Sequence, residues 1–279
     1  MKKIGIVGSG RWAKVTLKIL NNIFNEKIRF IIFSNYGTKQ IQNWIIEENF
    51  QNNYFEVVPY NQISNKLCDS YIIINAAKEH FEISKNIISL KKPLIIEKPI
   101  SLSKSDVKNL IDESNKEKVI LGTSNIFLFA DYILNLKKLI LPYRNISFIE
   151  FIWTDSKDES RYGDIKKYDP SLAIHKDVLP HILSIVFFLF EPNFISIKEI
   201  CFLKGGSSLE IFLVIDGKDC QIQIKRNSQK RQRIIKIFDK DLIKMDFSNE
   251  PGTVEINRKK EIIDPLWHKS ESPATKMYR

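Results

Sequence analysis

Three charged or rigid residues end one of the apolar runs of the sequence. Residues 94–96 (Leu-Ile-Ile) have the composition of a short strand buried on both faces, as in a parallel sheet. Glu97, Lys98 and Pro99 follow at once, and the proline cannot continue the strand. In open α/β sheets ligands bind beyond the carboxyl ends of the strands. An acid and a base at this position could therefore face a substrate.

A second pair of residues that could move a proton is Asp177 and His181. They are four positions apart, so they share a face if this segment is helical. An acid that holds an imidazole in one tautomer suits proton transfer, although a structural hydrogen bond would have the same spacing. The apolar flank Ile182–Phe190 predicts that the helix is mostly buried. His175 falls on a different face, and with no cysteine pair or carboxylate cluster nearby we predict no metal site.

A glycine turn lies near the N-terminus, in the stretch "VGSGRWA". Gly8, Gly10 and Ala13 have G-x-G-x-x-A spacing between an apolar strand and a helix. The first glycine allows a tight turn, the second lets a pyrophosphate approach the backbone, and the small third residue lets helix and strand pack closely. This turn predicts a dinucleotide site that uses Gly8, Ser9, Gly10, Arg11, Trp12 and Ala13.

The end of the second predicted strand bears on the choice of cofactor. NAD-binding folds commonly place an acidic residue there for the ribose hydroxyls, but no Asp or Glu occurs from Arg29 to Ile46. Ser34, Asn35 and Lys39 could instead accept a 2′-phosphate. The sequence therefore favours NADP(H), with NAD(H) as the alternative if the site is tolerant.

The segment "NAAKEHF" (75–81) follows the fourth predicted strand. It places Asn75 and Ala76 in the expected cofactor site. His80 could touch the nicotinamide side of that site, or it could equally be a residue that starts the next helix.

These residues need a scaffold, and the first part of the chain alternates strands with helices. Such alternation predicts βαβ units and a Rossmann-type, doubly wound parallel sheet over residues 1–122. Residues 123–279 are predicted to form an α+β domain with a mostly antiparallel open sheet, so that the whole chain is of the α/β class. This second part has an expected polar loop at 155–168 and an expected helix at 170–190. The expected strands are 3–7, 28–34, 55–58, 70–75, 93–97, 119–124, 146–154, 196–204, 208–217, 219–226, 233–239 and 241–247.

Bulk composition excludes several classes of protein. The chain has 279 residues, ordinary hydrophobic and charged content, and no apolar run long enough for a signal peptide or a membrane span. Three widely spaced cysteines fit a reducing cytoplasm better than a disulfide framework. The net charge of +10 would favour an anionic partner such as a nucleotide, but Lys, Asn and Ile are abundant throughout, and a compositional bias explains the charge equally simply, so it carries little weight. The basic run Lys225–Lys236 lacks interleaved aromatics, and a solvated hairpin explains it better than nucleic-acid binding.

Taken in order, "IGIVGSGRWA", "NAAKEHF", "LIIEKPIS" and "DVLPHILSI" resemble the Gfo/Idh/MocA oxidoreductases, the relatives of glucose–fructose oxidoreductase and inositol dehydrogenase. The resemblance covers nearly the whole chain. It implies that Lys98 lies beside the nicotinamide, binds substrate and assists proton transfer, while Glu97 and Pro99 fix the turn that aims it. It also implies that His181 is the general acid/base and that Asp177 is its preceding acid.

The resemblance implies hydride transfer between a nicotinamide and a sugar carbon, and by analogy the expected substrate is a nucleotide-activated sugar of surface polysaccharide biosynthesis. It further implies that the open sheet of the second domain supports a homodimer or larger homo-oligomer. Ile182, Ser184 and Leu179 depart from the family pattern around the histidine, and the tail "DPLWHKSESPATKMYR" resembles a closing helix that stops early. These departures keep open the alternative of a catalytically silent, NAD(P)-binding regulator.

Overall fold

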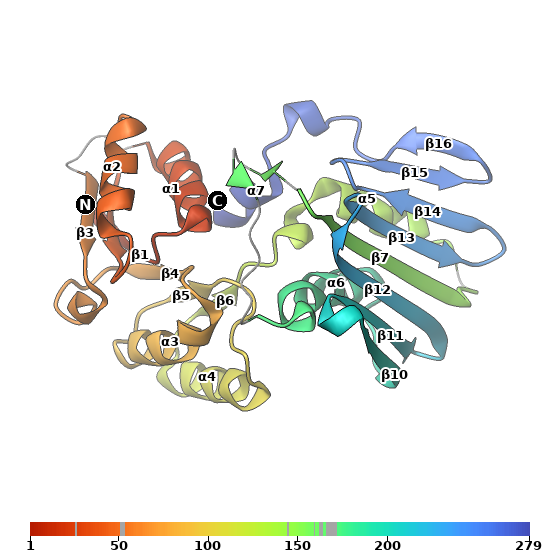
Figure 1. Ribbon diagram of the computed structural model, residues 1–279, viewed down its shortest axis with the longest axis horizontal. Coiled ribbons are helices and arrows are strands. Elements are labelled where there is room, and N and C mark those ends of the chain that lie inside the picture. Colours follow the sequence, from red (N-terminus) through yellow and green to blue (C-terminus); the bar gives the residue numbers. More distant parts are fainter. Residues whose placement is uncertain (26, 51–53, 144, 159, 162–163, 166–171) are drawn as a thin grey trace. The chain divides into compact units, whose positions relative to one another are not determined.

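The chain forms two compact units in the computed structural model, which describes residues 1–25, 27–50, 54–143, 145–158, 160–161, 164–165 and 172–279 (Figure 1). The first unit comprises Met1–Ser124 together with Met277–Arg279, and the second comprises Asn125–Lys276. The sequence prediction placed 277–279 in the second domain, whereas these residues pack with the first unit. No helix of the described residues is long and apolar enough to cross a membrane.

The first unit is built on a six-stranded sheet with the order β3-β2-β1-β4-β5-β6, and all of its pairings are parallel. The chain moves outward from β1 in one direction and then, from β4, in the other, so the topological switch point lies between β1 and β4. This is the doubly wound Rossmann order that the sequence predicts. The strands are β1 (Lys2–Val7), β2 (Ile28–Phe33), β3 (Phe55–Val58), β4 (Ser70–Ile73), β5 (Leu94–Ile96) and β6 (Leu121–Thr123).

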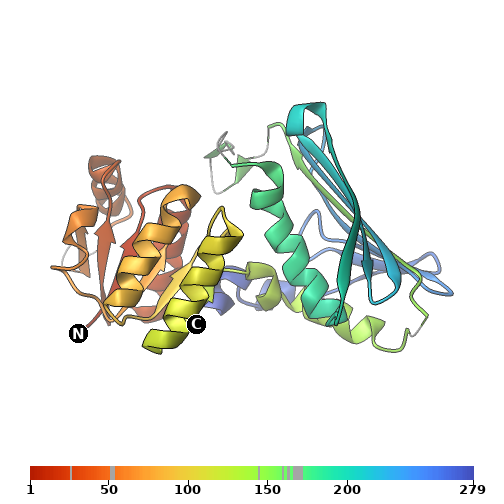
Figure 2. The same cartoon turned by 90° about the horizontal axis from the view of Figure 1, so that it is seen from below.

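Helices cover both faces of this sheet, which is why its strands are apolar on both sides. On one face α1 (Arg11–Phe24) and α2 (Thr38–Glu47) pack against a cluster that includes Ile6 and Ile32. On the other face α3 (His80–Ser89) and α4 (Lys104–Glu117) lie side by side (Figure 2). Tyr278 of α7 (Pro273–Tyr278) packs into the cluster that α1 and α2 share.

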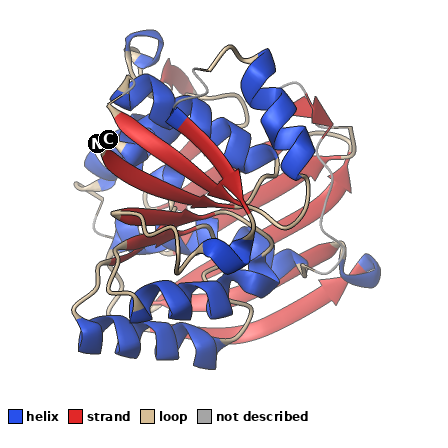
Figure 3. Ribbon diagram, turned by 90° about the vertical axis from the view of Figure 1, so that its left-hand side faces the viewer, coloured by secondary structure: helices blue, strands red, loops and turns tan. Residues whose placement is uncertain are grey.

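The second unit contains an eight-stranded sheet with the order β10-β11-β12-β7-β13-β14-β15-β16, drawn in red with the first sheet in Figure 3. Every pairing is antiparallel except that of β12 with β7. The prediction of a mostly antiparallel sheet is confirmed, but the last two strands were not predicted. The strands are β7 (Phe148–Ser156), β10 (Ile195–Leu203), β11 (Ser208–Ile215), β12 (Lys218–Ser228), β13 (Gln232–Phe238), β14 (Leu242–Asp246), β15 (Thr253–Ile256) and β16 (Lys259–Ile262), and a separate two-residue pair is formed by β8 (Ser160–Arg161) and β9 (Asp164–Ile165).

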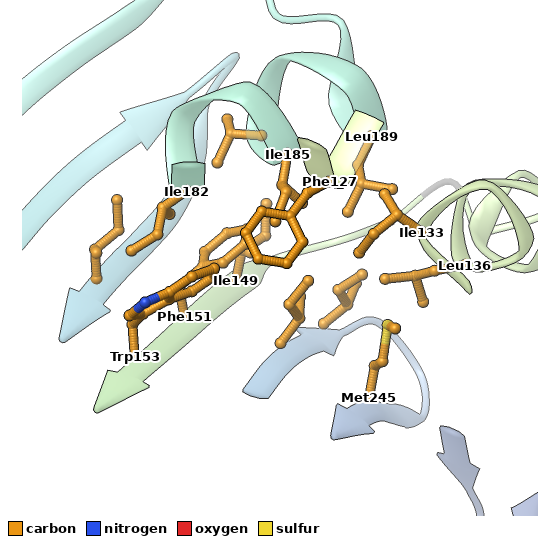
Figure 4. Packing of buried hydrophobic residues seen from close by; sticks show 14 of the residues in the cluster. Phe127, Ile133, Leu136, Ile149, Phe151, Trp153, Ile182, Ile185, Leu189 and Met245 are labelled. Carbon is orange, nitrogen blue, oxygen red and sulfur yellow. The ribbon is translucent and has the colours of Figure 1, made fainter. Parts of the chain in front are cut away.

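One face of the eight-stranded sheet carries the core of the second unit. Helices α5 (Asp131–Ile140) and α6 (Ile174–Phe190) pack their apolar stripes against alternate residues of the strands (Figure 4). The expected helix at 170–190 begins at Ile174, and its first two expected positions lie outside the described residues. Six of the fourteen residues of the expected polar loop at 155–168 also lie outside the described residues, and β7 continues into this segment through Ser156.

Two leucines of α5 test this account of the core. Leu136 is fully buried, whereas Leu134 on the same helix is 40% exposed. We expect Leu136→Ala to lower the free energy of unfolding by about 2–5 kcal/mol, because it removes buried methyl groups and leaves a cavity. Leu134→Ala is the matched control, with an expected change of about 0.5 kcal/mol or less. Urea denaturation followed by circular dichroism measures both, and equal effects would contradict the packing described.

Candidate functional site

The predicted cofactor residues of the first unit lie at one edge of its parallel sheet. Gly8 follows β1, Ser34 follows β2, Asn75 lies just beyond β4, and Glu97 follows β5. Because parallel strands end at the same edge, all of these residues share the carboxyl edge of the sheet. Backbone hydrogen bonds extend the strand pairing beyond this edge: the Gly8 N–H donates to the Phe33 carbonyl oxygen at 2.9 Å.

The glycine turn has the geometry that its spacing predicts. Gly8 has φ +129°, and a Cβ on it would lie 2.9 Å from the backbone nitrogen of Asn75, so this position requires glycine. Gly10 caps α1 with φ −73°, and a Cβ there would meet no heavy atom of the described residues within 4 Å. Ala13 is fully buried where α1 meets the sheet, while Arg11 and Trp12 are half-buried. The open space at Gly10, beside the first N–H groups of a 14-residue helix, fits a pyrophosphate.

Two serines of the cofactor region are bonded to one another and to the same carbonyl. The Ser9 Oγ lies 2.7 Å from the Ser34 Oγ and 2.7 Å from the Tyr36 carbonyl oxygen, to which the Ser34 hydroxyl also donates. Ser34 is buried, and each hydroxyl has one proton. The hydroxyl proton of Ser34 is therefore already used in a hydrogen bond within the turn. This residue is poorly suited to donate a further hydrogen bond to a 2′-phosphate.

The other residues proposed for the 2′-phosphate have free donor capacity. Asn35 is exposed, and its Oδ1 accepts a hydrogen bond of 3.0 Å from the Tyr60 N–H, so its amide nitrogen can still donate. Lys39 is exposed in the first turn of α2, where Gly37 caps the helix with φ +70°. The N–H groups of the first turn of α2 give this helix end a partial positive charge, which adds to the charge of Lys39.

The imidazole of His80 joins two segments of the carboxyl edge. Its Nδ1 lies 2.8 Å from the Pro99 carbonyl oxygen, and its Nε2 lies 3.1 Å from the Asn75 carbonyl oxygen. The residue begins α3 and is only 1% exposed. Of the two alternatives for His80, these contacts favour a residue that starts the helix over one that touches the nicotinamide. It ties the segment after β4 to the E-K-P turn, while Ala76 remains exposed beside it.

Burial and hydrogen bonding act on the pKa of His80 in opposite directions. Burial penalises the charged ring and is the larger effect, so the pKa lies below its usual value although the Pro99 and Asn75 carbonyls raise it. A neutral ring donates only one hydrogen bond, whereas a charged ring could donate to both carbonyls.

The E-K-P turn follows β5 as predicted. The Glu97 N–H extends the ladder by donating to the Ile73 carbonyl at 2.8 Å, and the Glu97 carboxylate accepts a hydrogen bond from the Ser124 hydroxyl. Lys98 is half-buried, and the Lys98–Pro99 peptide bond is cis. The acid thus anchors the turn to the segment after β6, and the lysine stands at the carboxyl edge of the sheet.

Asp177 of the second unit pairs with an arginine that sequence reasoning did not identify. Its Oδ2 lies 3.0 Å from the Nη2 of Arg226, whose guanidinium also donates two bonds of 3.1 Å to the Leu172 carbonyl. Arg226 belongs to β12, and the two side chains are only 12% and 20% exposed. The expected pairing of Asp177 with His181 stays a prediction, while the ion pair with Arg226 fixes the carboxylate near the start of α6.

His181 lies on α6 among aromatic side chains. Its ring is stacked on Trp153 with centroids 6.0 Å apart and an interplanar angle of 15°, and it meets Phe127 edge-on at 5.2 Å. The guanidinium of Arg233 also lies over the Trp153 ring, at 4.2 Å from its centroid. These contacts restrict the orientation of the imidazole ring. A general acid or base needs such a fixed orientation, because its nitrogen must point at the proton that it transfers.

The basic run Lys225–Lys236 is not the solvated hairpin that composition suggested. Arg233 is only 2% exposed and donates to the buried Asp155, and Arg231 donates to the Ser248 carbonyl. With Arg226 bound to Asp177, three arginines of the run have partners within the second unit. Their charges therefore serve internal contacts and do not form an outward basic patch. Among the described residues, no cluster of His, Cys, Asp or Glu could hold a metal ion.

Comparison with known proteins gives the class of the first unit. Residues 2–124 match the family described as "Oxidoreductase family, NAD-binding Rossmann fold", GFO_IDH_MocA. The match confirms the resemblance that the motifs indicate: the nucleotide-binding unit belongs to the Gfo/Idh/MocA oxidoreductase family. Among curated proteins, none matches this chain in sequence.

Solved structures show that the fold of the whole chain is shared. UDP-N-acetylglucosamine 3-dehydrogenase from Acidithiobacillus ferrooxidans is 15% identical with a TM-score of 0.76, over 99% of this chain and 86% of that one. A dehydrogenase from Clostridium difficile is 17% identical with a TM-score of 0.73, over 93% and 82%. A Gfo/Idh/MocA family oxidoreductase from Vibrio cholerae is 13% identical with a TM-score of 0.71, over 99% and 85%. At these identities the likeness shows the fold alone.

The burial of His80 makes its contribution to stability depend on pH. Its folded-state pKa lies below the unfolded value, so the unfolded state binds the proton first as the pH falls, and stability decreases below about pH 6.5. We expect His80→Phe to lower the free energy of unfolding by about 1–3 kcal/mol at pH 7.5, because a buried carbonyl loses its donor. The variant should also lose less stability than the wild type between pH 7.5 and 5.5.

Urea denaturation at both pH values measures this difference. His268→Phe is the control, since His268 is exposed. A pH dependence of His80→Phe equal to that of the wild type would contradict the role assigned to this ring.

Proposed function

We propose that the protein is an NADP(H)-dependent oxidoreductase that transfers a hydride between the nicotinamide and a hydroxyl-bearing carbon of a sugar. The observation that carries this proposal is the open helix N-terminus at Gly10, at the same sheet edge as Lys98, in a unit of the Gfo/Idh/MocA family. Fold alone would not assign an activity. The glycine geometry and the lysine supply the site-level argument.

The cofactor would be held by residues at the carboxyl edge of the first sheet. The N–H groups that begin α1 would bind the pyrophosphate beside Gly8 and Gly10, with Ser9, Arg11, Trp12 and Ala13 completing the turn. Asn75, Ala76, Glu97 and Lys98 would border the nicotinamide end. When bound, the nicotinamide supplies the hydride chemistry, and the protein's task is orientation and proton transfer.

Lys98 and His181 are the residues proposed to handle the proton of the sugar hydroxyl. Oxidation of an alcohol by hydride transfer releases that proton, so a base must accept it, and the reverse reaction needs an acid. Lys98 would hold the reacting oxygen and stabilise its developing negative charge. His181, with its plane fixed by Trp153 and Phe127, would take or give the proton. Asp177, tied to Arg226, would be the positioning acid of α6.

Preference for NADP(H) is proposed to depend on Lys39 and Asn35. Ser34, which the sequence also suggested, has its hydroxyl directed to the Tyr36 carbonyl. Lys39 is exposed at the start of α2 and could pair with a 2′-phosphate, as could the amide nitrogen of Asn35. NAD(H) would lack this contact.

The substrate class is proposed from the chemistry of the site and from a structural neighbour. A neighbour of the same fold is named UDP-N-acetylglucosamine 3-dehydrogenase, which supports a nucleotide-activated sugar as the substrate to try first. A role in polysaccharide biosynthesis, a cytoplasmic location and a homo-oligomeric state remain predictions of the sequence. The competing proposal is a catalytically silent NAD(P)-binding regulator, which the departures at Leu179, Ile182 and Ser184 favour.

Titration of nucleotide fluorescence with NADPH and NADH tests the cofactor site. We expect tighter binding of NADPH, and Lys39→Ala should weaken it about tenfold or more because a charge-assisted contact worth about 1.5–3 kcal/mol is lost. NADH binding should change little. Lys108→Ala, which removes an exposed charge from α4 on the other face of the sheet, is the matched control.

The same titration includes Gly10→Ala. This residue has an ordinary φ and open space around it, so the variant should keep its melting temperature. It should nevertheless bind both nucleotides much more weakly, because the methyl group occupies the space proposed for the pyrophosphate. Unchanged binding by Gly10→Ala, or no binding by the wild type, would refute the cofactor site.

Turnover distinguishes the enzyme from the silent regulator. With a panel of UDP-sugars followed by NADPH absorbance, we expect Lys98→Met and His181→Asn each to lower kcat by about 10²–10⁴, the usual contribution of a positioned acid or base. Both should still bind NADPH. His268→Asn, an exposed histidine of the same unit, is the control. Full activity of either variant would remove that residue from the mechanism, and NADPH binding without turnover by the wild type on any sugar would support the regulator.

A further inference from the structure

The two edges of the eight-stranded sheet differ in how well they are protected. At one end of the strand order, β16 is four residues long and carries two lysines and a glutamate. A short, charged edge strand resists pairing with another chain. At the other end, β10 is nine residues long, and its only charged residues are the adjacent Lys198 and Glu199. The edge formed by β10 therefore offers a long row of backbone groups for pairing.

The apolar side chains of β10 gather on one face of this edge. Ile197 faces Leu213 of β11, and after a register shift Ile200 and Phe202 face Ile211 and Leu209. These β11 partners are buried beneath the helices, so directly opposed residues of β10 lie on the same side of the sheet. The bulge thus keeps Ile197 and Ile200 on one face although they are three apart.

That stripe is exposed. Ile197 is 62% exposed, Ile200 47% and Phe202 55%. Scattered surface leucines or isoleucines need no explanation, but aligned large apolar side chains on an unprotected edge do. Their position next to free backbone groups indicates a strand as the covering element.

The sequence of β10 is self-complementary about its two charged residues. In an antiparallel pair of two copies centred between Lys198 and Glu199, each lysine faces the glutamate of the other copy. The same register sets Ile197 against Ile200, Ser196 against Cys201, and Ile195 against Phe202. On the face of the sheet that α5 and α6 cover, apolar residues of one copy then lie opposite apolar residues of the other. At the centre of the pair, each positive charge lies opposite a negative charge.

We propose that β10 pairs with β10 of a second copy of this chain, antiparallel and about a two-fold axis, to join two eight-stranded sheets. Such an interface is isologous, as in most homodimers, and it removes the unprotected edge. Lys198 now holds Asp219 at 2.6 Å, but that pair is more than half exposed and can be exchanged at little cost.

The two charges also specify the register. A shift of one residue in either direction would set Lys198 against Lys198 of the second copy, or Glu199 against Glu199. Like charges directly opposite one another are destabilising. A one-residue slip would also set the apolar stripe of one copy against residues of the opposite face of the other copy. The register centred between the two charged residues satisfies both conditions, whereas neither one-residue shift does.

Disulfide trapping tests the register. Ser196→Cys introduces a thiol that would face the native Cys201 of the second copy, with Cβ atoms about 5 Å apart in a regular pair. Within one chain the two positions are about 16 Å apart along the strand, too far for a bond. Incubation of the full-length variant with oxidised glutathione should therefore give a covalent dimer on a non-reducing gel at least tenfold faster than the controls. These are Ser196→Cys combined with Cys201→Ser, and Lys260→Cys on the opposite edge.

Sedimentation velocity of uncross-linked protein gives an independent measurement. Ile200→Glu should halve the sedimenting mass of any oligomer that depends on β10, whereas Ile262→Glu on β16 should leave it unchanged. Both residues are exposed, and a preserved melting temperature shows that the variants fold. Cross-linking no faster than in the controls, together with an unchanged mass for Ile200→Glu, would overturn the proposal. A dimer that forms only through the open face of the sheet would give both of these results.

Discussion

The arrangement of the first unit depends on a single constraint, that all six strands of its sheet run in parallel. Parallel pairing requires a crossover after every strand, so every strand ends at the same edge and is followed by a loop. That edge receives the glycine turn from β1, the Ser34–Tyr36 turn from β2, the Asn75 segment from β4 and the E-K-P turn from β5. Residues far apart in sequence thereby become neighbours without any special interaction between them.

The E-K-P turn shows why a buried strand should end in an acid, a base and a proline. The acid has a structural task, because Glu97 accepts a hydrogen bond from Ser124 beyond the neighbouring strand β6. The proline offers its carbonyl to His80, which in turn meets the segment after β4. Glu97 and Pro99 therefore fix the backbone on both sides of Lys98 through neighbours at the same sheet edge. A lysine on a free loop would have to lose more conformational entropy to reach one position.

Much of this organisation could be predicted from sequence because it has local signals. Glycine spacing and apolar strands each identify an element within a few residues, and the strands of the first unit were predicted nearly at their observed bounds. Pairings between distant residues lack such a signal. Nothing near Asp177 indicates that Arg226, 49 residues later, will bind it, or that the hydroxyl of Ser34 will be directed to a backbone carbonyl. Strand β16 was missed because its charged residues resemble a loop, although charge is what an edge strand needs.

The arginines of the second unit show how composition can mislead when it is considered without burial. A run with several cations suggests a solvated hairpin, yet burying an arginine without a partner is costly, and each of the three is bound. The pair of Arg233 with Asp155 is nearly inaccessible, so desolvation offsets much of its Coulomb energy, and net stability is a poor reason for keeping it. What the pair does provide is orientation: the guanidinium lies against Trp153, and Trp153 lies against the imidazole of His181. A buried charge with defined hydrogen bonds tolerates fewer arrangements than an apolar side chain of the same size. The ring on which proton transfer is proposed to depend is therefore placed by a polar contact deep in the unit, two side chains away from it.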